Sequence, residues 1–178
     1  MQKQKRRTDG FTLIELLIVV SIIGILAAMA VPDLLRARMS ANEASAIGTL
    51  RAINSGEATF SSSCGRGGYA QTLDDLALAP VGGTSVGFIS PDLSTNGVTK
   101  SGYAVNLAPD VGATDIAAVG AACTNNASTT VSSYFAEDHP AAAGSAQRSF
   151  ATDTRGTLYY LNTGVAITAG MAGAIALQ

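Results

Sequence analysis

An uninterrupted apolar run near the N-terminus, from Phe11 to Val31, constrains the fold of this chain more than any other stretch. Glu15 is the only charged residue within it. At a rise of about 1.5 Å per residue, a helix of this length crosses the roughly 30 Å hydrocarbon core of a bilayer. The sequence therefore predicts one membrane-spanning helix over residues 11–31.

The residues in front of this run form a short basic leader, which contains Lys3, Lys5, Arg6 and Arg7. Basic residues beside a span hold that side in the cytoplasm, so the chain after the span is expected on the opposite side. In a secretory signal the small residue at the cleavage site follows the apolar region, whereas here Gly10 precedes it. A cut after Gly10 would remove the charges and leave the apolar helix on the mature protein.

The stretch Gly10-Phe11-Thr12-Leu13-Ile14-Glu15, with Pro32 behind it, closely resembles the class III leader and N-terminal helix of type IV pilins and type II secretion pseudopilins. The resemblance is dense over residues 5–38 and much weaker beyond residue 60. It implies cleavage between Gly10 and Phe11 by a membrane-embedded prepilin peptidase. N-methylation of the new Phe11 amine and assembly into a helical filament would follow.

Glu15 has two interpretations. An acid in a membrane helix costs on the order of 2.5–3.5 kcal/mol on insertion scales and usually marks a function. In the first interpretation, Glu15 lies near enough to the cytoplasmic face for its carboxylate to reach the interface. In the second, which the resemblance implies, the carboxylate pairs with the Phe11 amine of a neighbouring subunit. Such a pair, formed away from water, would select the axial register of incoming subunits.

Gly24 and Pro32 are expected to weaken the helix. Glycine is a poor helix former, and the missing N–H and the ring of Pro32 disturb the turn that contains Ala28. Either the helix continues with a gentle kink, or the segment 24–32 can melt. Because lipid offers backbone groups no other partner, we expect the kink in an isolated subunit and melting only in a filament, where neighbouring helices compensate.

Beyond Pro32 the helical pattern continues, which predicts one helix over residues 11–60, about 75 Å long. Its second half carries an apolar stripe that is expected to pack on a sheet. We expect Arg51, Asn54 and Glu57 elsewhere on the surface. The stripe consists of Ala44, Ile47, Leu50, Ile53 and Phe60.

Residues 61–178 are expected to form the head of an α+β protein, in which a small antiparallel sheet follows the long helix. Turn-forming residues at 61–68 end the helix. Thr72 is predicted to cap a short helix, with Asp75 where a capping acid would sit. The segment from Pro80 to Gly97 is loop-like.

Alternating residues predict strands over 103–107 and 131–136. The segments 148–152 and 157–161 flank a good hairpin turn. The tail, residues 165–178, is too short for a second span and has two interpretations, an edge strand or a loose end packed on a neighbour.

Cys64 and Cys123 are the only cysteines. An even number in a head placed outside the cytoplasm favours one disulfide. It would close a loop of about 60 residues and contribute about 4 kcal/mol on the chain-entropy model. The pairing departs from the C-terminal disulfide loop of many pilins.

The sequence carries no recognisable motif for catalysis or phosphate binding, and no cofactor or metal is expected. His139, in Glu137-Asp138-His139-Pro140, is expected in a solvated turn.

Five acids could supply oxygen atoms to calcium, but they lack the spacing of an EF-hand. They are Asp110, Asp115, Glu137, Asp138 and Asp153. Asn126-Ala127-Ser128 fits a glycosylation sequon. The net charge of the whole chain is −2. Residues 1–10 carry four positive charges and one negative charge, so the chain from Phe11 onward carries −5, which does not favour nucleic-acid binding by the head.

Together these features predict a structural subunit of a type IV pilus, with a leader over residues 1–10, a long helix over 11–60 and a head over 61–178. The precursor would cross the inner membrane once, and the mature protein would join a periplasmic or cell-surface filament. Its expected partners are copies of itself, the prepilin peptidase, an inner-membrane assembly platform and lipid. One alternative is a type II secretion pseudopilin. A more remote one is a single-span membrane protein whose head binds a ligand.

Overall fold

The computed structural model describes residues 10–83, 86–142 and 147–177, so the basic leader residues 1–9 lie outside the described residues. The chain forms two compact units, which divide after Ser40. Helix α1, Leu13–Ser63, begins in the first unit and ends in the second.

The first unit consists mainly of the apolar half of α1. The helix runs through Gly24 and Pro32 without a break, as expected for an isolated subunit. A kink at these two residues remains a prediction.

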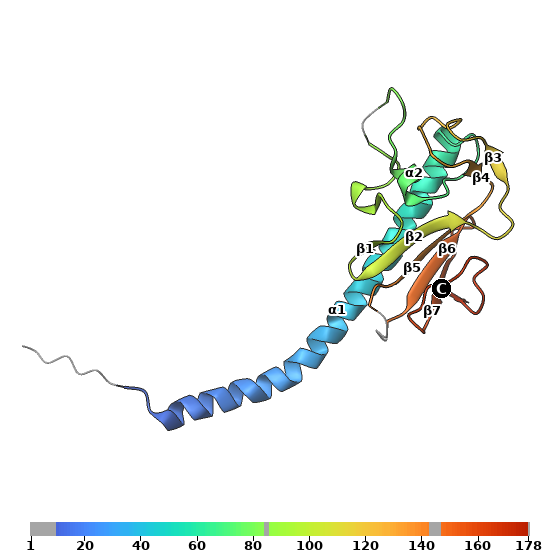
Figure 1. Ribbon diagram of the computed structural model, residues 1–178. Helices are drawn as coiled ribbons and strands as arrows, with labels where there is room; N and C mark the ends of the chain where they lie inside the picture. Colours follow the sequence, from blue (N-terminus) through green and yellow to red (C-terminus); the bar gives the residue numbers. More distant parts are fainter. Residues whose placement is uncertain (1–9, 84–85, 143–146, 178) are drawn as a thin grey trace, which may run out of the picture. The chain divides into compact units, whose positions relative to one another are not determined.

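The second unit is the α+β head, built on the remainder of α1 (Figure 1). A short helix α2, Leu73–Ala77, and a 3₁₀ turn η1, Pro91–Leu93, follow α1. Within the described residues, the strands are β1 Val98–Lys100, β2 Tyr103–Pro109, β3 Asp115–Ala117, β4 Thr130–Val131, β5 Tyr134–Pro140, β6 Ser149–Asp153, β7 Leu158–Leu161 and β8 Ile175–Ala176. The α+β fold predicted from the sequence is confirmed.

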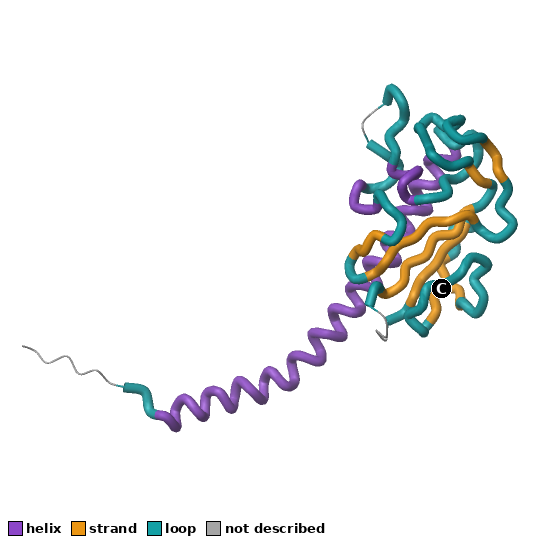
Figure 2. Tube along the Cα trace, viewed as in Figure 1, coloured by secondary structure: helices purple, strands orange, loops and turns teal. Residues whose placement is uncertain are grey.

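The main sheet is antiparallel, with the strand order β1-β2-β5-β6-β7-β8. Figure 2 shows the central strands side by side, with long loops at the ends of the sheet. The predicted hairpin is β6–β7, whose turn is closed by the N–H of Gly156, which donates to the carbonyl of Asp153 at 2.8 Å. Gly156 has a φ of +72°, which glycine adopts without a steric penalty. β3 and β4 form a separate two-stranded sheet, and Val131 of β4 also bridges to Tyr69.

The core lies between one face of the sheet and the second half of α1. On α1 the fully buried apolar side chains are Leu50, Ile53 and Phe60. The alternate β2 residues Tyr103, Val105 and Leu107 belong to the same core cluster. Burying these side chains contributes about 1.5–3 kcal/mol for each large one, which is why the head packs around this half of the helix.

The predicted apolar stripe on α1 is partly wrong. Ala44 is exposed, whereas Ala46 is buried and belongs to the core. Glu57, expected on the surface, is 0% exposed because it follows Ile53 by four residues and lies on the same helix face.

Asn54 is half-buried and connects α1 to the sheet. Its Oδ1 accepts a hydrogen bond from the Tyr134 hydroxyl at 2.8 Å, and its Nδ2 donates to Thr152 Oγ1 at 3.0 Å.

The C-terminal segment covers part of the other face of the sheet. Ile167 is buried there with Phe135 and Ala151 in a second, smaller core. At its end, β8 pairs with β7 through Ile175 and Ala176. Of the two interpretations of the tail, the edge strand is therefore confirmed for these two residues.

Candidate functional site

The Gly10–Phe11 junction directly precedes α1 and is open. Phe11 is 80% exposed, and no heavy atom would lie within 4 Å of a Cβ added at Gly10. Nothing in the described part of the subunit therefore requires a small residue at position 10. A requirement for glycine would come from a molecule that acts on this junction.

Thr12 and Glu15 form the N-terminal cap of α1. Thr12 Oγ1 accepts a hydrogen bond from the Glu15 N–H at 3.3 Å, and the Thr12 hydroxyl donates to Glu15 Oε2 at 3.4 Å. This is a variant of the capping box, in which a threonine and a glutamate three residues on satisfy each other. Both residues are exposed, and none of the salt bridges among the described residues involves Glu15.

The apolar half of α1 is exposed on all sides. The side chains between Phe11 and Leu35 that are large and apolar remain roughly half or more accessible, from 46% at Val19 to 82% at Leu13. By length and composition α1 meets the requirement for crossing a membrane. A helix that is apolar on every face needs lipid or other helices around it.

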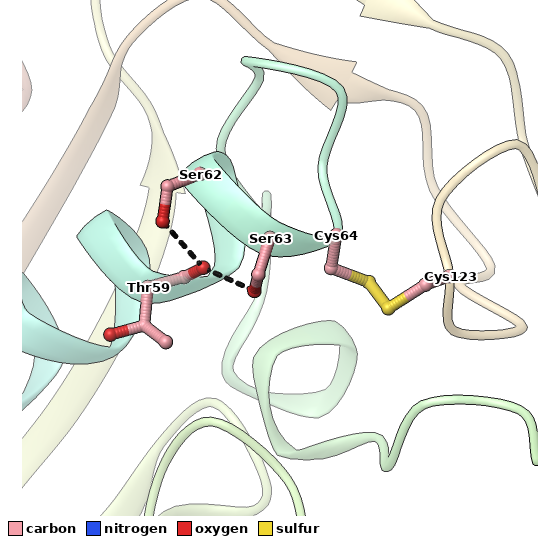
Figure 3. Close-up of a disulfide and its surroundings, with 5 residues drawn as sticks. All are labelled: Thr59, Ser62, Ser63, Cys64 and Cys123. Atoms are coloured by element: carbon pink, nitrogen blue, oxygen red, sulfur yellow. Dashed lines mark hydrogen bonds between the residues drawn. A yellow bond between two sulfur atoms is a disulfide. The ribbon is translucent and has the colours of Figure 1, made fainter. Parts of the chain in front are cut away.

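The predicted disulfide joins Cys64 and Cys123, 59 residues apart, and ties the end of α1 to the loop before β4 (Figure 3). The last helical turn is closed by serine hydroxyls: Ser62 and Ser63 both donate to the Thr59 carbonyl, at 3.1 and 2.6 Å. The Cys123 N–H also donates to the Cys64 carbonyl at 3.3 Å, so a backbone hydrogen bond accompanies the disulfide. The sequence prediction of this pair is confirmed.

The prediction of a solvated turn at His139 is wrong. Glu137, Asp138 and His139 belong to β5, a central strand whose residues are mostly buried. Glu137 accepts from Asn106 Nδ2 at 2.7 Å and contacts His139 Nδ1 at 3.0 Å. Three consecutive polar residues before a proline look like a solvated turn in sequence, but here residues on both faces of the strand are buried.

The acids considered for calcium are not brought together. Within the described residues no group of three or more His, Cys, Asp or Glu side chains is placed to hold a metal ion. Asp153 instead binds the guanidinium of Arg155, with Nε at 2.7 Å. Asn126 of the sequon is only 4% exposed, and its amide nitrogen donates to the Ser128 carbonyl.

Two acids whose burial the sequence did not predict, Asp75 and Glu57, lie elsewhere in the head. Asp75 follows the N-cap Thr72 as predicted, and its N–H donates to Thr72 Oγ1 at 3.2 Å. Its carboxylate does not complete the cap but accepts from the Ala127 N–H at 2.9 Å. Glu57 accepts from the Ala70 N–H at 3.0 Å, and burial raises its pKa to about 8.

An open junction after a small residue, an exposed apolar helix with one acid near its start, and an antiparallel sheet packed on the other half of that helix define the pilin-like class of membrane-anchored proteins. The prokaryotic N-terminal methylation motif matches residues 5–31. The narrow pilus major component PilA5 of Thermus thermophilus is 41% identical over 91 residues, which cover 50% of this chain and 76% of that protein. The chain belongs to the type IV pilin family.

Two further relatives match over shorter shares of their length. The type IV major pilin PilA of Myxococcus xanthus is 38% identical over 82 residues, or 46% of this chain and 36% of that protein. The type II secretion system core protein G of Aeromonas hydrophila is 42% identical over 50 residues, or 28% of this chain and 35% of that protein. The alignments thus span about a third of each of these two relatives. No solved structure matched the chain.

Proposed function

We propose that this chain is a structural subunit of a type IV pilus. The observation that carries the proposal is the exposed apolar half of α1, with one exposed acid, Glu15, at its start and an open Gly10–Phe11 junction before it. The relatives add support. The match to the Myxococcus pilin covers 82 residues, whereas α1 contains 51, so the similarity is not limited to this helix.

In this proposal the leader, residues 1–10, is removed by a prepilin peptidase. The precursor crosses the inner membrane once, with its head on the non-cytoplasmic side. Cleavage frees the amine of Phe11, and N-methylation keeps that amine cationic. An assembly platform in the inner membrane then draws the helix, residues 11–60, out of lipid and into a periplasmic or cell-surface filament, which the head, residues 61–178, covers.

Glu15 sets the register of assembly. Its partner within the subunit is the neutral hydroxyl of Thr12, at a long 3.4 Å, so the carboxylate keeps its capacity to accept from a cation. The Phe11 amine of an adjacent copy supplies that cation in a setting from which water is excluded. A misregistered subunit would leave both charges unpaired, which costs several kcal/mol per ion.

The mature N-terminus tests the proposal. Mass spectrometry of protein sheared from cells should find a chain that begins at Phe11 and carries one methyl group on its amine. Electron microscopy of the same preparation should show filaments made of this subunit. A mature protein that retains Lys3 to Gly10, or filaments that lack the chain, would contradict the proposal.

A second candidate function is that of a type II secretion pseudopilin, favoured by the match to the Aeromonas core protein G. Both functions require the same processing, so the mature N-terminus does not separate them. Deletion of the gene separates them: a pilin mutant loses surface filaments, whereas a pseudopilin mutant retains them and accumulates secreted enzymes in the periplasm.

A further inference from the structure

Two arginines, Arg36 and Arg38, lie on the part of α1 between the apolar run, which ends at Val31, and the head unit, which begins at Ala41. Both arginines are exposed. Among the described residues Arg38 makes no salt bridge, and Arg36 makes one, to Asp33 at 3.8 Å, between side chains that are 81% and 80% exposed. Exposed pairs of this kind contribute little to stability, so both guanidinium groups keep their donors for a partner outside the chain.

The head holds α1 at residues further along the helix. The first side-chain hydrogen bonds between α1 and the rest of the head are made by Glu43, which binds Arg148, and by Ser45, whose hydroxyl lies 2.9 Å from that of Ser101. The two arginines precede Glu43 by seven and five residues. Contacts with the head therefore do not account for the two exposed cations.

The position of the two arginines fits the headgroup layer of a bilayer. α1 continues through this region without a break. With Val31 at the edge of the hydrocarbon, the Cα atoms of Arg36 and Arg38 lie about 7.5 and 10.5 Å beyond that edge. The headgroup layer extends about 5–7 Å beyond the hydrocarbon on each side. Side chains on a helix point toward its N-terminus, here back toward the membrane, so both guanidinium groups reach the level of the lipid phosphates.

The two arginines lie on opposite sides of α1, because residues two apart in a helix are separated by about 200° around its axis. A protein that bound one face of the helix would contact only one of them. A layer of lipid headgroups surrounds the helix and contacts both. Leu34 and Leu35, directly before Arg36, are each 55% exposed, and apolar side chains suit the boundary between hydrocarbon and headgroups.

We propose that Arg36 and Arg38 bind the phosphate groups of anionic phospholipids in the non-cytoplasmic leaflet of the membrane. A guanidinium group suits this partner, since it binds phosphate through two parallel hydrogen bonds. The inference rests on the proposed function, which places this end of the span on the non-cytoplasmic side. It adds the lipid chemistry and the residues that recognise it.

The contact would act as a stop in one direction. Movement of the span toward the cytoplasm would draw both arginines into the hydrocarbon, which is costly for charged groups. Movement in the opposite direction, which assembly requires, takes them into water. In the precursor the four basic residues of the leader outnumber the two arginines and set the orientation. After cleavage, Arg36 and Arg38 are the basic side chains nearest to the span and hold the mature helix at its depth.

Lipid binding by the protein, purified from membranes in an uncharged detergent, tests the contact. Native mass spectrometry measures its affinity for short-chain phosphatidylglycerol, which is anionic, and for short-chain phosphatidylcholine, which has no net charge. The wild type should prefer phosphatidylglycerol by about tenfold or more. Arg36→Gln and Arg38→Gln should each weaken phosphatidylglycerol binding about fivefold, the effect of one basic residue at an anionic surface. The double variant should lose the preference.

Arg51→Gln is the matched control, because Arg51 is an exposed arginine of α1 within the head, and it should bind as the wild type does. A retained leader would be common to all variants, so their differences report on the arginines alone. The mass of the purified chain reports separately on cleavage.

Equal affinities of the wild type for the two lipids would overturn the proposal, whatever the variants do. An undiminished preference in the double variant, or an equal loss in Arg51→Gln, would do the same. Displacement of the lipid by excess inorganic phosphate would show a site for a free anion in place of a lipid contact.

Discussion

Arg148, which directly precedes β6, donates three hydrogen bonds to the carboxylate of Glu43 on α1. Its Nη2 and Nε atoms donate to Glu43 Oε2 at 2.6 and 3.1 Å, and its backbone N–H donates to Oε1 at 3.2 Å. The guanidinium also lies over the rings of Phe150 and Tyr160, at 5.5 and 5.4 Å from their centroids. The Arg148–Glu43 pair connects the sheet to α1 close to the start of the head at Ala41.

Arg148→Lys should lower the free energy of unfolding of the head by about 1 kcal/mol, although it conserves the charge. Lysine cannot reproduce the forked donors or the stacking on two rings, and the partial exposure of the pair limits the loss. Denaturant unfolding of the variant measures the change. Arg36→Lys, at an exposed arginine of the same helix, is the control and should have no effect. Equal losses in the two variants would count against a specific role of the pair.

Asp138 should make the stability of the head depend on pH. It is 0% exposed and neither of its oxygens has a hydrogen-bond partner. Burial raises its pKa to about 8, the negative charge of Glu137 adds to this rise and Lys100 opposes it. The pKa in the folded state thus lies above that in the unfolded chain, where the ordinary value for aspartate is about 3.9.

A group of this kind stabilises the fold fully below pH 4, and the contribution is lost as the pH rises toward 8. Asp138→Asn cannot ionise, so its unfolding midpoint should decline less than that of the wild type between pH 5 and pH 8. Thermal scans at intervals of one pH unit provide the measurement. Parallel curves for the two proteins would show that Asp138 does not titrate in this range.

The Cys64–Cys123 disulfide should withstand alkylation of the native protein. The intact chain should show no free thiol and should gain two hydrogens in mass on reduction. Cys64→Ser should lower the stability of the head by about 4 kcal/mol on the chain-entropy model, since the bond closes a long loop. Membrane insertion of this variant should remain unchanged because the span folds separately. Thiols that alkylate without reductant would argue against the bond.

Cleavage should require a small residue at position 10. Gly10→Phe is expected to block processing, although the position is open in the subunit, because a peptidase must fit this residue beside the scissile bond. The precursor should accumulate in the inner membrane with its basic leader attached, as immunoblotting would show. Normal filaments from Gly10→Phe would contradict cleavage at this junction.

Glu15→Ala removes a costly acid from the span, so the subunit should insert at least as well as the wild type. If Glu15 pairs with the Phe11 amine of the next subunit, filament yield should nevertheless fall by at least tenfold. Glu15→Lys should assemble less well still, because it places two cations together. The measurement is the ratio of sheared filament to membrane-bound subunit.

Thr12→Ala controls for the helix cap. It removes the hydroxyl that accepts from the Glu15 N–H but leaves the carboxylate in place. The filament yield of Thr12→Ala should therefore fall less than that of Glu15→Ala. Equal filament yields for the wild type, Glu15→Ala and Glu15→Lys would mean that the carboxylate only reaches the interface and that other contacts set the register.

The sequence alone determined the features that depend on neighbouring residues. The apolar run after Gly10 predicts the long helix, and the cap at Thr72 and the turn at Gly156 follow from local hydrogen bonding and backbone geometry. The disulfide was predictable as well, because two cysteines allow only one pairing within the chain. The helix, the cap and the turn each depend on residues that are close in sequence. The disulfide depends on two cysteines that have no alternative partner in the chain.

Only the tertiary structure decided which charged residues are buried. In the sequence, Glu57, Asp75 and Asp138 look like ordinary surface acids. The strands of the head are short and carry few apolar residues, so the sequence does not indicate which strands pair or which side chains they bury. Glu57 accepts a hydrogen bond from Ala70, thirteen residues further along the chain, and Asp138 lies on β5, which pairs with β2 and β6 in the middle of the sheet. The free energy of burying a carboxylate depends on contacts between residues far apart in the chain, and no local pattern records those contacts.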